Sequence, residues 1–268
     1  LEPIGDTKAD VIDEARRAIL LAEGSIYLAG GVESMSKVPF YVKDLRWGHR
    51  LGSTTLVDGL MDEGLSCPIT GMGMGLTAEE VAKRTGITRE AMDAWARRSQ
   101  ERAHAAIAAG AFAREIVPTP RRKDGPFAVD EHPRETSLEA LAKLRPAFCE
   151  GGCVTAGNAS GINDGAAALL VVEADRAREL ALKPRARIVA QLLVGSDPYY
   201  LLDGPVDATA RVLKRAGMSM ADVDLFEVNE AFASVVLSWA RVHNPDMDRV
   251  NVNGGAIALG HPFGCTGA

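Results

Sequence analysis

The residues best suited to chemistry lie at the end of the sequence, where a histidine is surrounded by glycines. In the segment Asn251–Ala268, His261 stands between Gly260 and Pro262. Glycine lets the backbone approach a ligand or another backbone closely, and Pro262 restricts the direction of the preceding imidazole. The pattern indicates a catalytic loop that carries His261. A glycine-rich turn with a surface histidine is the alternative that this segment alone leaves open.

A second candidate, Asn229, follows a short apolar run. The pattern of Val223–Val228 predicts a strand, and that of Glu230–Val242 predicts an amphipathic helix. Asn229 then occupies a strand-to-helix turn, the place where open α/β sheets bind their ligands. Taken alone, an asparagine before a helix is more typical of an N-cap.

The elements around these two residues alternate in type at both ends of the chain. Apolar spacing predicts helices at 11–24, 174–181 and 207–216, and strands at 25–29, 166–172 and 186–190. The continuous apolar run Ala166–Val172 is typical of a strand buried on both faces. Between residues 35 and 161 the clearest element is a helix over Arg89–Gly110, with Thr88 as its N-cap and Gly110 as its stop. This order fits an α/β fold with an inserted loop domain.

Composition narrows the class of protein. The chain has 268 residues, of which 47% are hydrophobic and 25% charged, and a net charge of −6. These values predict a globular protein without a membrane span or a general affinity for nucleic acid. The four cysteines are too sparse for a disulfide scaffold, and no signal peptide pattern precedes them, so we expect a cytoplasmic protein. The cluster Arg121-Arg122-Lys123 is interpreted mainly as a solvated loop, although a local basic cluster can bind a polyanion.

Four motifs occur in a fixed order along the sequence: Gly30–Ser36 (GGVESMS), Thr155–Gly165 (TAGNASGINDG), Asn229–Phe232 (NEAF) and Gly260–Pro262 (GHP). Together they resemble the thiolases, the acetyl-CoA C-acyltransferases, and the resemblance runs from about residue 11 to the end. It implies a layered α-β-α-β-α fold of two related halves with an inserted loop domain, incomplete here at both ends. The implied division is 1–36 for the N-terminal half, 37–162 for the loop domain, 163–185 for the return to the N-terminal half and 186–268 for the C-terminal half.

The resemblance also implies a reaction, the thiolytic cleavage of a 3-ketoacyl-CoA or the reverse condensation. In the family a cysteine thiolate takes up the acyl group, a histidine activates it, and an asparagine positions a water near the developing oxyanion. His261 and Asn229 match these two positions. The positions that match CoA recognition are Met74, Arg134, Phe148, Ala156 and Ser160. Coenzyme A is then a substrate, no metal or other cofactor is implied, and the family's members are homodimers or homotetramers.

Two further features bear on the substrate and on activity. Gly73 stands where many short-chain thiolases carry a histidine, which favours longer or bulkier acyl chains. An ungapped alignment on residues 25–31 places the nucleophilic cysteine at Gly5, and the family's second catalytic cysteine would follow Ala268. Three interpretations explain why no cysteine stands at the position of the family's nucleophile. The sequence is part of a longer chain, the protein is a non-catalytic acyl-CoA-binding or scaffold protein, or it is an enzyme with a different nucleophile.

Overall fold

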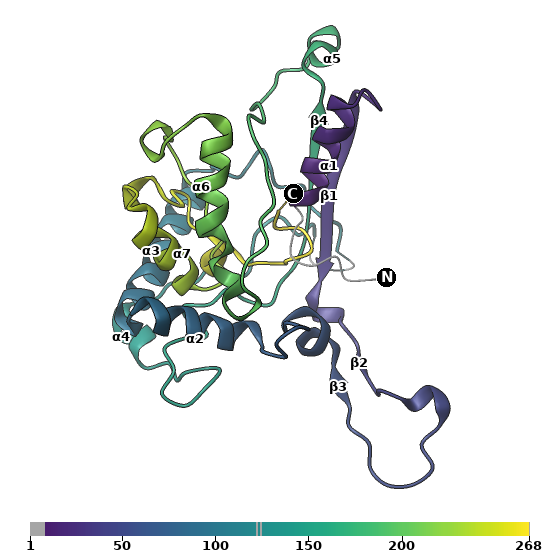
Figure 1. Ribbon diagram of the computed structural model, residues 1–268, viewed down its shortest axis with the longest axis vertical. Coiled ribbons are helices and arrows are strands. Elements are labelled where there is room, and N and C mark those ends of the chain that lie inside the picture. Colours follow the sequence, from purple (N-terminus) through teal and green to yellow (C-terminus); the bar gives the residue numbers. More distant parts are fainter. Residues whose placement is uncertain (1–8, 122, 124, 268) are drawn as a thin grey trace. The chain divides into compact units, whose positions relative to one another are not determined.

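The computed structural model describes residues 9–121, 123 and 125–267, so Gly5 and Arg122 lie outside the described residues. The described chain divides into two compact units (Figure 1). The first unit combines residues 9–74, 162–193 and 262–267, and the second combines residues 75–161 and 194–261. Each unit joins segments from more than one of the domains expected from the sequence, and that division therefore stays a prediction. Within the described residues, no helix is long and apolar enough to cross a membrane.

The first unit is built on a long antiparallel pair of strands. Strand β1 (Ile26–Ser34) pairs with β4 (Asp164–Val172), in a register that runs from Ile26 opposite Val172 to Ser34 opposite Asp164. Helix α1 (Ala9–Leu20) packs against β1 and buries Ala15 and Ala18. The unit also contains the short pair β2 (Phe40–Tyr41) and β3 (Val57–Asp58), and helix α5 (Ala174–Glu179).

The second unit is helical. Its elements are α2 (Met74–Thr85), which begins at the last residue of the first unit, α3 (Arg89–Ala108), α4 (Leu138–Ala142), α6 (Gly204–Ala216), α7 (Ala233–His243) and α8 (Ala256–Leu259). Helix α3 contacts α4, α7 and α8. Its buried face repeats every three to four residues, as an amphipathic helix requires, through Met92, Trp95, Ala96, Ser99, Ala103 and Ala106.

The prediction of a helix over 89–110 is confirmed. The Thr88 hydroxyl accepts a hydrogen bond from the Ala91 N–H at 3.2 Å, which satisfies one of the amide groups that a helix start leaves without a partner. Gly110, two residues beyond the helix end, has a φ of +68°. This left-handed conformation suits glycine and ends the helix.

Two predicted strands are absent, and a third forms as expected but is not buried. Residues 186–190 form no regular element, and residues 223–228 contribute only a single parallel bridge between Phe226 and Val250. The run 166–172 does form strand β4, but its side chains are largely exposed, including Leu170 at 56%. The run at 166–172 pairs with β1, but other described residues leave most of its side chains uncovered.

The expected helix start at Glu230 also differs, because α7 begins at Ala233. Residues 230–232 are fixed by other contacts instead: Glu230 is fully buried, the Ala231 carbonyl accepts from Ser160, and Phe232, which is extended, bridges to Ala159. Phe232 is the N-cap residue of α7. The N-cap interpretation of Asn229 is therefore wrong.

Candidate functional site

Asn229 and His261, which are 32 residues apart, meet in the second unit. The amide nitrogen Nδ2 of Asn229 lies 3.2 Å from Nε2 of the His261 imidazole. The Asn229 side chain is exposed and His261 is half-buried, so the pair is open to a ligand. The motif matches imply that these two residues share one site, and their approach to hydrogen-bonding distance is confirmed. A pocket that they share with Ser160 or Phe148 stays a prediction.

The position of His261 depends on how helix α8 ends. The helix stops at Leu259, and Gly260 follows with φ +97° and ψ 164°, a conformation that residues with a Cβ rarely adopt. The Gly260 N–H still donates to the Ala256 carbonyl at 2.9 Å. The chain therefore leaves the helix abruptly at Gly260, and His261 is the first residue after that turn.

The position of Asn229 depends on the residue before it. Both backbone groups of Val228 are bonded to the side chain of Asn251: the Val228 N–H donates to Oδ1, and Nδ2 donates to the Val228 carbonyl, each at 2.8 Å. Two residues earlier, Phe226 exchanges backbone hydrogen bonds with Arg249 at 2.9 Å and Asn251 at 2.8 Å. The segment that ends at Asn229 is thus fixed along its length without being a regular strand.

The Asn229–His261 contact can hold the imidazole whether or not its Nε2 carries a proton. An amide N–H can only donate, so Nδ2 bonds to an Nε2 that is unprotonated. When the amide is rotated by 180°, its oxygen accepts from a protonated Nε2. Asn229 can therefore support His261 before and after a proton transfer, which is what a group that alternates between base and acid requires.

The turn at 158–160 lies directly beside the segment after Asn229. The N–H and the hydroxyl of Ser160 both donate to the Ala231 carbonyl at 3.0 Å, and the Ala233 N–H donates to the Asn158 carbonyl at 2.9 Å. Ala159 forms an antiparallel bridge with Phe232. Ser160 is therefore bonded to the residue two positions after Asn229.

The other predicted CoA-binding residues occupy different positions. Phe148 is 41% exposed and packs edge-to-face on Phe232, with ring centroids 6.1 Å apart. Ala156 and Arg134 are exposed, and the Arg134 N–H donates to the Gln100 side chain at 3.0 Å. Met74 begins α2 and belongs to the first unit. Phe148 and Ser160 thus contact the stretch that follows Asn229, whereas the roles of Arg134, Ala156 and Met74 stay predictions.

Two buried carboxylates fix the loops that carry these residues. Asp93 accepts from Arg89 Nε at 2.7 Å and from Asn158 Nδ2 at 2.8 Å, which attaches the 158–160 turn to α3. Glu79 accepts from the N–H groups of Cys153 and Val154, each at 2.9 Å, next to the segment that carries Phe148. Sequence reasoning missed both residues. For Asp93 the one local signal is a carboxylate on the apolar face of the predicted helix 89–110.

Burial and charge perturb several titratable groups in the described chain. Burial, together with the Glu79 carboxylate, raises the pKa of the Cys153 thiol to about 12. Burial and the neighbouring Arg134 lower the pKa of His132, whose Nε2 lies 3.2 Å from the Ile257 carbonyl. Hydrogen bonds from Thr70 lower the pKa of the buried Cys67.

Among the described residues, no group of three or more His, Cys, Asp or Glu side chains could hold a metal ion.

Comparison with known families identifies the family of this chain. The thiolase N-terminal domain family matches residues 8–175, and the thiolase C-terminal domain family matches residues 182–268. The chain belongs to the thiolase family. The family resemblance read from the four motifs is confirmed.

Similar proteins agree with this membership. An acetyl-CoA acetyltransferase from Chromobacterium violaceum is 48% identical over 258 residues, which cover 94% of this chain and 66% of the relative. Human mitochondrial 3-ketoacyl-CoA thiolase superposes with a TM-score of 0.94 at 42% identity, over 97% of this chain and 67% of that one. The same human thiolase in complex with CoA gives a TM-score of 0.93 at 43% identity, over 97% and 66% of the two chains.

These comparisons establish the thiolase fold, a mixed α/β fold, for this chain. They also show that the chain spans about two thirds of the length of the curated thiolases that it matches.

Proposed function

We propose that the protein containing this chain is an acyl-CoA C-acyltransferase, which cleaves a 3-ketoacyl-CoA by thiolysis or runs the reverse condensation. The observation that carries the proposal is the Asn229–His261 contact of 3.2 Å in a chain of the thiolase family. A histidine held by an amide suits a reaction in which one imidazole both removes and returns a proton.

In the proposed mechanism His261 accepts the proton of an attacking thiol, because the thiolate is the nucleophilic form. The imidazole and a water bound to Asn229 then donate hydrogen bonds to the oxyanion that develops on the thioester carbonyl. The family's nucleophile is a cysteine. The position that aligns with it, Gly5, lies outside the described residues.

Coenzyme A is the proposed substrate, and the CoA complex of the similar human thiolase supports this choice. The Ser160 hydroxyl uses its proton on the Ala231 carbonyl and keeps lone pairs with which to accept from a pantetheine amide N–H. Exposed ring surface on Phe148 suits the apolar part of pantetheine, and the exposed Arg134 guanidinium suits a phosphate. Ala156 and Met74 complete the proposed contacts.

We further propose the metabolic role, location and oligomeric state that accompany this activity in the family. The protein works in fatty acid metabolism in the cytoplasm, assembles as a homodimer or homotetramer, and needs no cofactor, since CoA is its substrate. Glycine at position 73 favours longer or bulkier acyl chains.

The first test is turnover by the complete gene product that contains these 268 residues, with acetoacetyl-CoA and a longer 3-ketoacyl-CoA as substrates. His261→Ala is expected to lower kcat by ~10²–10⁴-fold, the usual cost of losing a general base. His104→Ala, on helix α3, is the control and should leave the rate unchanged. An active wild type whose rate survives His261→Ala would refute the proposed site.

The second test is CoA binding by the 268-residue chain itself, measured by calorimetric titration. Arg134→Ala should weaken binding, and more strongly at low salt, where charge interactions are screened less. Binding by the chain with no turnover by the complete protein would favour a non-catalytic acyl-CoA-binding protein. Absence of both would overturn the proposal.

A further inference from the structure

We propose that Glu230 is a positioning residue that holds Asn229 and His261 within hydrogen-bonding distance, acting through the backbone on both sides of the pair. The inference rests on the proposed function, because it assigns Glu230 a part in the work of that site. Glu230 follows Asn229 directly in the sequence, and its side chain turns away from the pair into the interior of the second unit.

The Glu230 carboxylate is fully buried, with 0% of the residue exposed, and four donors surround it. Oε1 accepts from Trp95 Nε1 at 3.0 Å and from Asn251 Nδ2 at 2.9 Å. Oε2 accepts from the Ser99 hydroxyl at 2.6 Å and from the Ile257 N–H at 3.1 Å. An ionised carboxylate has about four acceptor sites, so these contacts fill it.

The charge state of Glu230 follows from these partners. Burial raises the pKa of Glu230 above its usual range, and the four hydrogen bonds act against that rise. All four contacts are satisfied at once when the carboxylate is ionised, since it then accepts every one of them. A neutral amide at this position would place an NH₂ group against groups that are already donating.

The Ile257 contact joins Glu230 to His261. Ile257 is the second residue of α8, and His261 lies four residues further on, just beyond the end of that short helix. Ser99 strengthens the same attachment, because its hydroxyl oxygen also accepts from the Gly255 N–H at 3.0 Å. A Cβ on Gly255 would lie 2.2 Å from the Glu230 carboxyl carbon, so the backbone passes this close only because residue 255 is glycine.

The Asn251 contact joins Glu230 to Asn229. Asn251 is 1% exposed and has a φ of +48°, a left-handed conformation that asparagine tolerates better than most residues. Its amide holds both backbone groups of Val228 and also donates to Glu230. Glu230 therefore orients the amide that fixes the residue immediately before Asn229.

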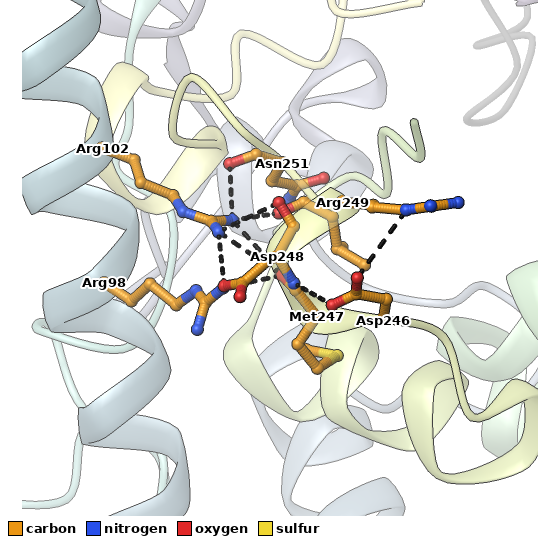
Figure 2. Close-up of polar contacts among 8 residues, drawn as sticks. Arg98, Arg102, Asp246, Met247, Asp248, Arg249 and Asn251 are labelled. Atoms are coloured by element: carbon orange, nitrogen blue, oxygen red, sulfur yellow. Dashed lines mark hydrogen bonds and ion pairs between the residues drawn. The ribbon is translucent and has the colours of Figure 1, made fainter. Parts of the chain in front are cut away.

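The segment around Asn251 is fixed in turn to α3 by two arginines (Figure 2). Arg102 donates to the carbonyl groups of Val250 and Asn251, and Arg98 donates to the Met247 carbonyl at 2.7 Å. Both guanidinium groups also reach the Asp248 carboxylate, at 2.6 Å from Arg98 and 3.5 Å from Arg102. Because this outer attachment is independent of Glu230, the segment should stay folded when the carboxylate is altered.

The test is Glu230→Gln in the complete gene product. We expect kcat to fall by ~10–10²-fold, the scale of a misplacement of about 1 Å, with the KM for CoA within about twofold of wild type. Glu79→Gln is the matched control, since Glu79 is also a buried carboxylate that accepts backbone N–H groups, but beside Phe148. It should raise the KM for CoA more than it lowers kcat.

A readout that does not need turnover separates this inference from the proposed function. In the 268-residue chain, the NMR titration of the His261 imidazole should shift in Glu230→Gln and stay unchanged in Glu79→Gln, with His104 as an internal reference. If the complete wild-type protein is inert, the proposed function fails while this measurement still decides the role of Glu230.

Ser99→Ala covers the case in which Glu230→Gln does not fold. It removes one of the four donors and should shift the His261 titration in the same direction by a smaller amount. Normal kcat and an unchanged His261 titration in a folded Glu230→Gln or Ser99→Ala variant would overturn the inference.

Discussion

Substitution of Asp93 by asparagine tests how the 158–160 turn is held. Asp93 is 4% exposed and accepts from two donors, Arg89 Nε at 2.7 Å and Asn158 Nδ2 at 2.8 Å. An asparagine amide has nearly the same shape but offers one acceptor and one NH₂ group. In Asp93→Asn one of the two contacts must therefore place a donor against a donor, and the other loses its charge.

The magnitude follows from these contacts. A hydrogen bond to a charged group contributes ~1.5–3 kcal/mol, and breaking a buried ion pair costs ~3–5 kcal/mol. The Arg89 side chain keeps 20% exposure, so water recovers part of its loss. We expect Asp93→Asn to lower the free energy of unfolding by ~3 kcal/mol, and to weaken CoA binding because Asn158 belongs to the proposed binding turn.

Urea denaturation followed by tryptophan fluorescence measures the effect, because Trp95 and Trp239 are buried in the same unit. Glu101→Gln is the control on the same helix. Glu101 pairs with Arg97 at 3.0 Å across an exposed surface, and such pairs contribute ~0.3–0.5 kcal/mol. If Asp93→Asn destabilises no more than Glu101→Gln, the proposed attachment of the turn to α3 is wrong.

Two further predictions concern other contacts in the second unit. Folding raises the pKa of the Cys153 thiol from 9.0 to about 12. Between these two pH values the thiol of the unfolded chain is ionised while that of the folded chain still holds its proton. The free energy of unfolding should therefore fall as the pH rises from 9 towards 12. Cys153→Ser removes this term, and the difference in unfolding free energy between wild type and variant should therefore shrink from pH 8 to pH 10.5; a constant difference would contradict the assignment. Gly255→Ala should lower the melting temperature and kcat together, because the added Cβ displaces the Glu230 carboxylate; an alanine variant with wild-type values of both would show that the close approach is not needed.

The sequence predicted the Asn229–His261 pair and helix α3 well, because both leave local signals. Motif order located the two polar residues, and the Thr88 cap with a periodic apolar face located the helix. Glu230, Asn251 and Asp93 were missed as supporting residues. Several of their partners lie far away in the chain, as Trp95 does from Glu230 at a separation of 135 positions, and no local pattern records such a contact.

The strand errors have a related cause. The apolar residues at 166–172 and 223–228 predict burial or strand pairing. Whether such a run becomes a covered strand depends on residues that are distant in the sequence. Phe226 finds a single bridge to Val250 because the side chain of Asn251 occupies the backbone groups of Val228 that a further strand partner would need.

Helix α3 sets the spacing between the segments that form the site. Asp93 holds the 158–160 turn, Trp95 and Ser99 hold Glu230, and Arg102 holds the segment that ends at Asn251. From residue 93 to residue 102 the helix advances ~14 Å, at ~1.5 Å per residue, so these anchoring points are spaced by helix geometry. A loop can gain or lose residues without altering that spacing. One residue inserted between Asp93 and Arg102 would rotate every anchoring residue after the insertion by ~100° about the helix axis. The 158–160 turn and the Asn229–His261 pair would then no longer be held in their present positions relative to each other.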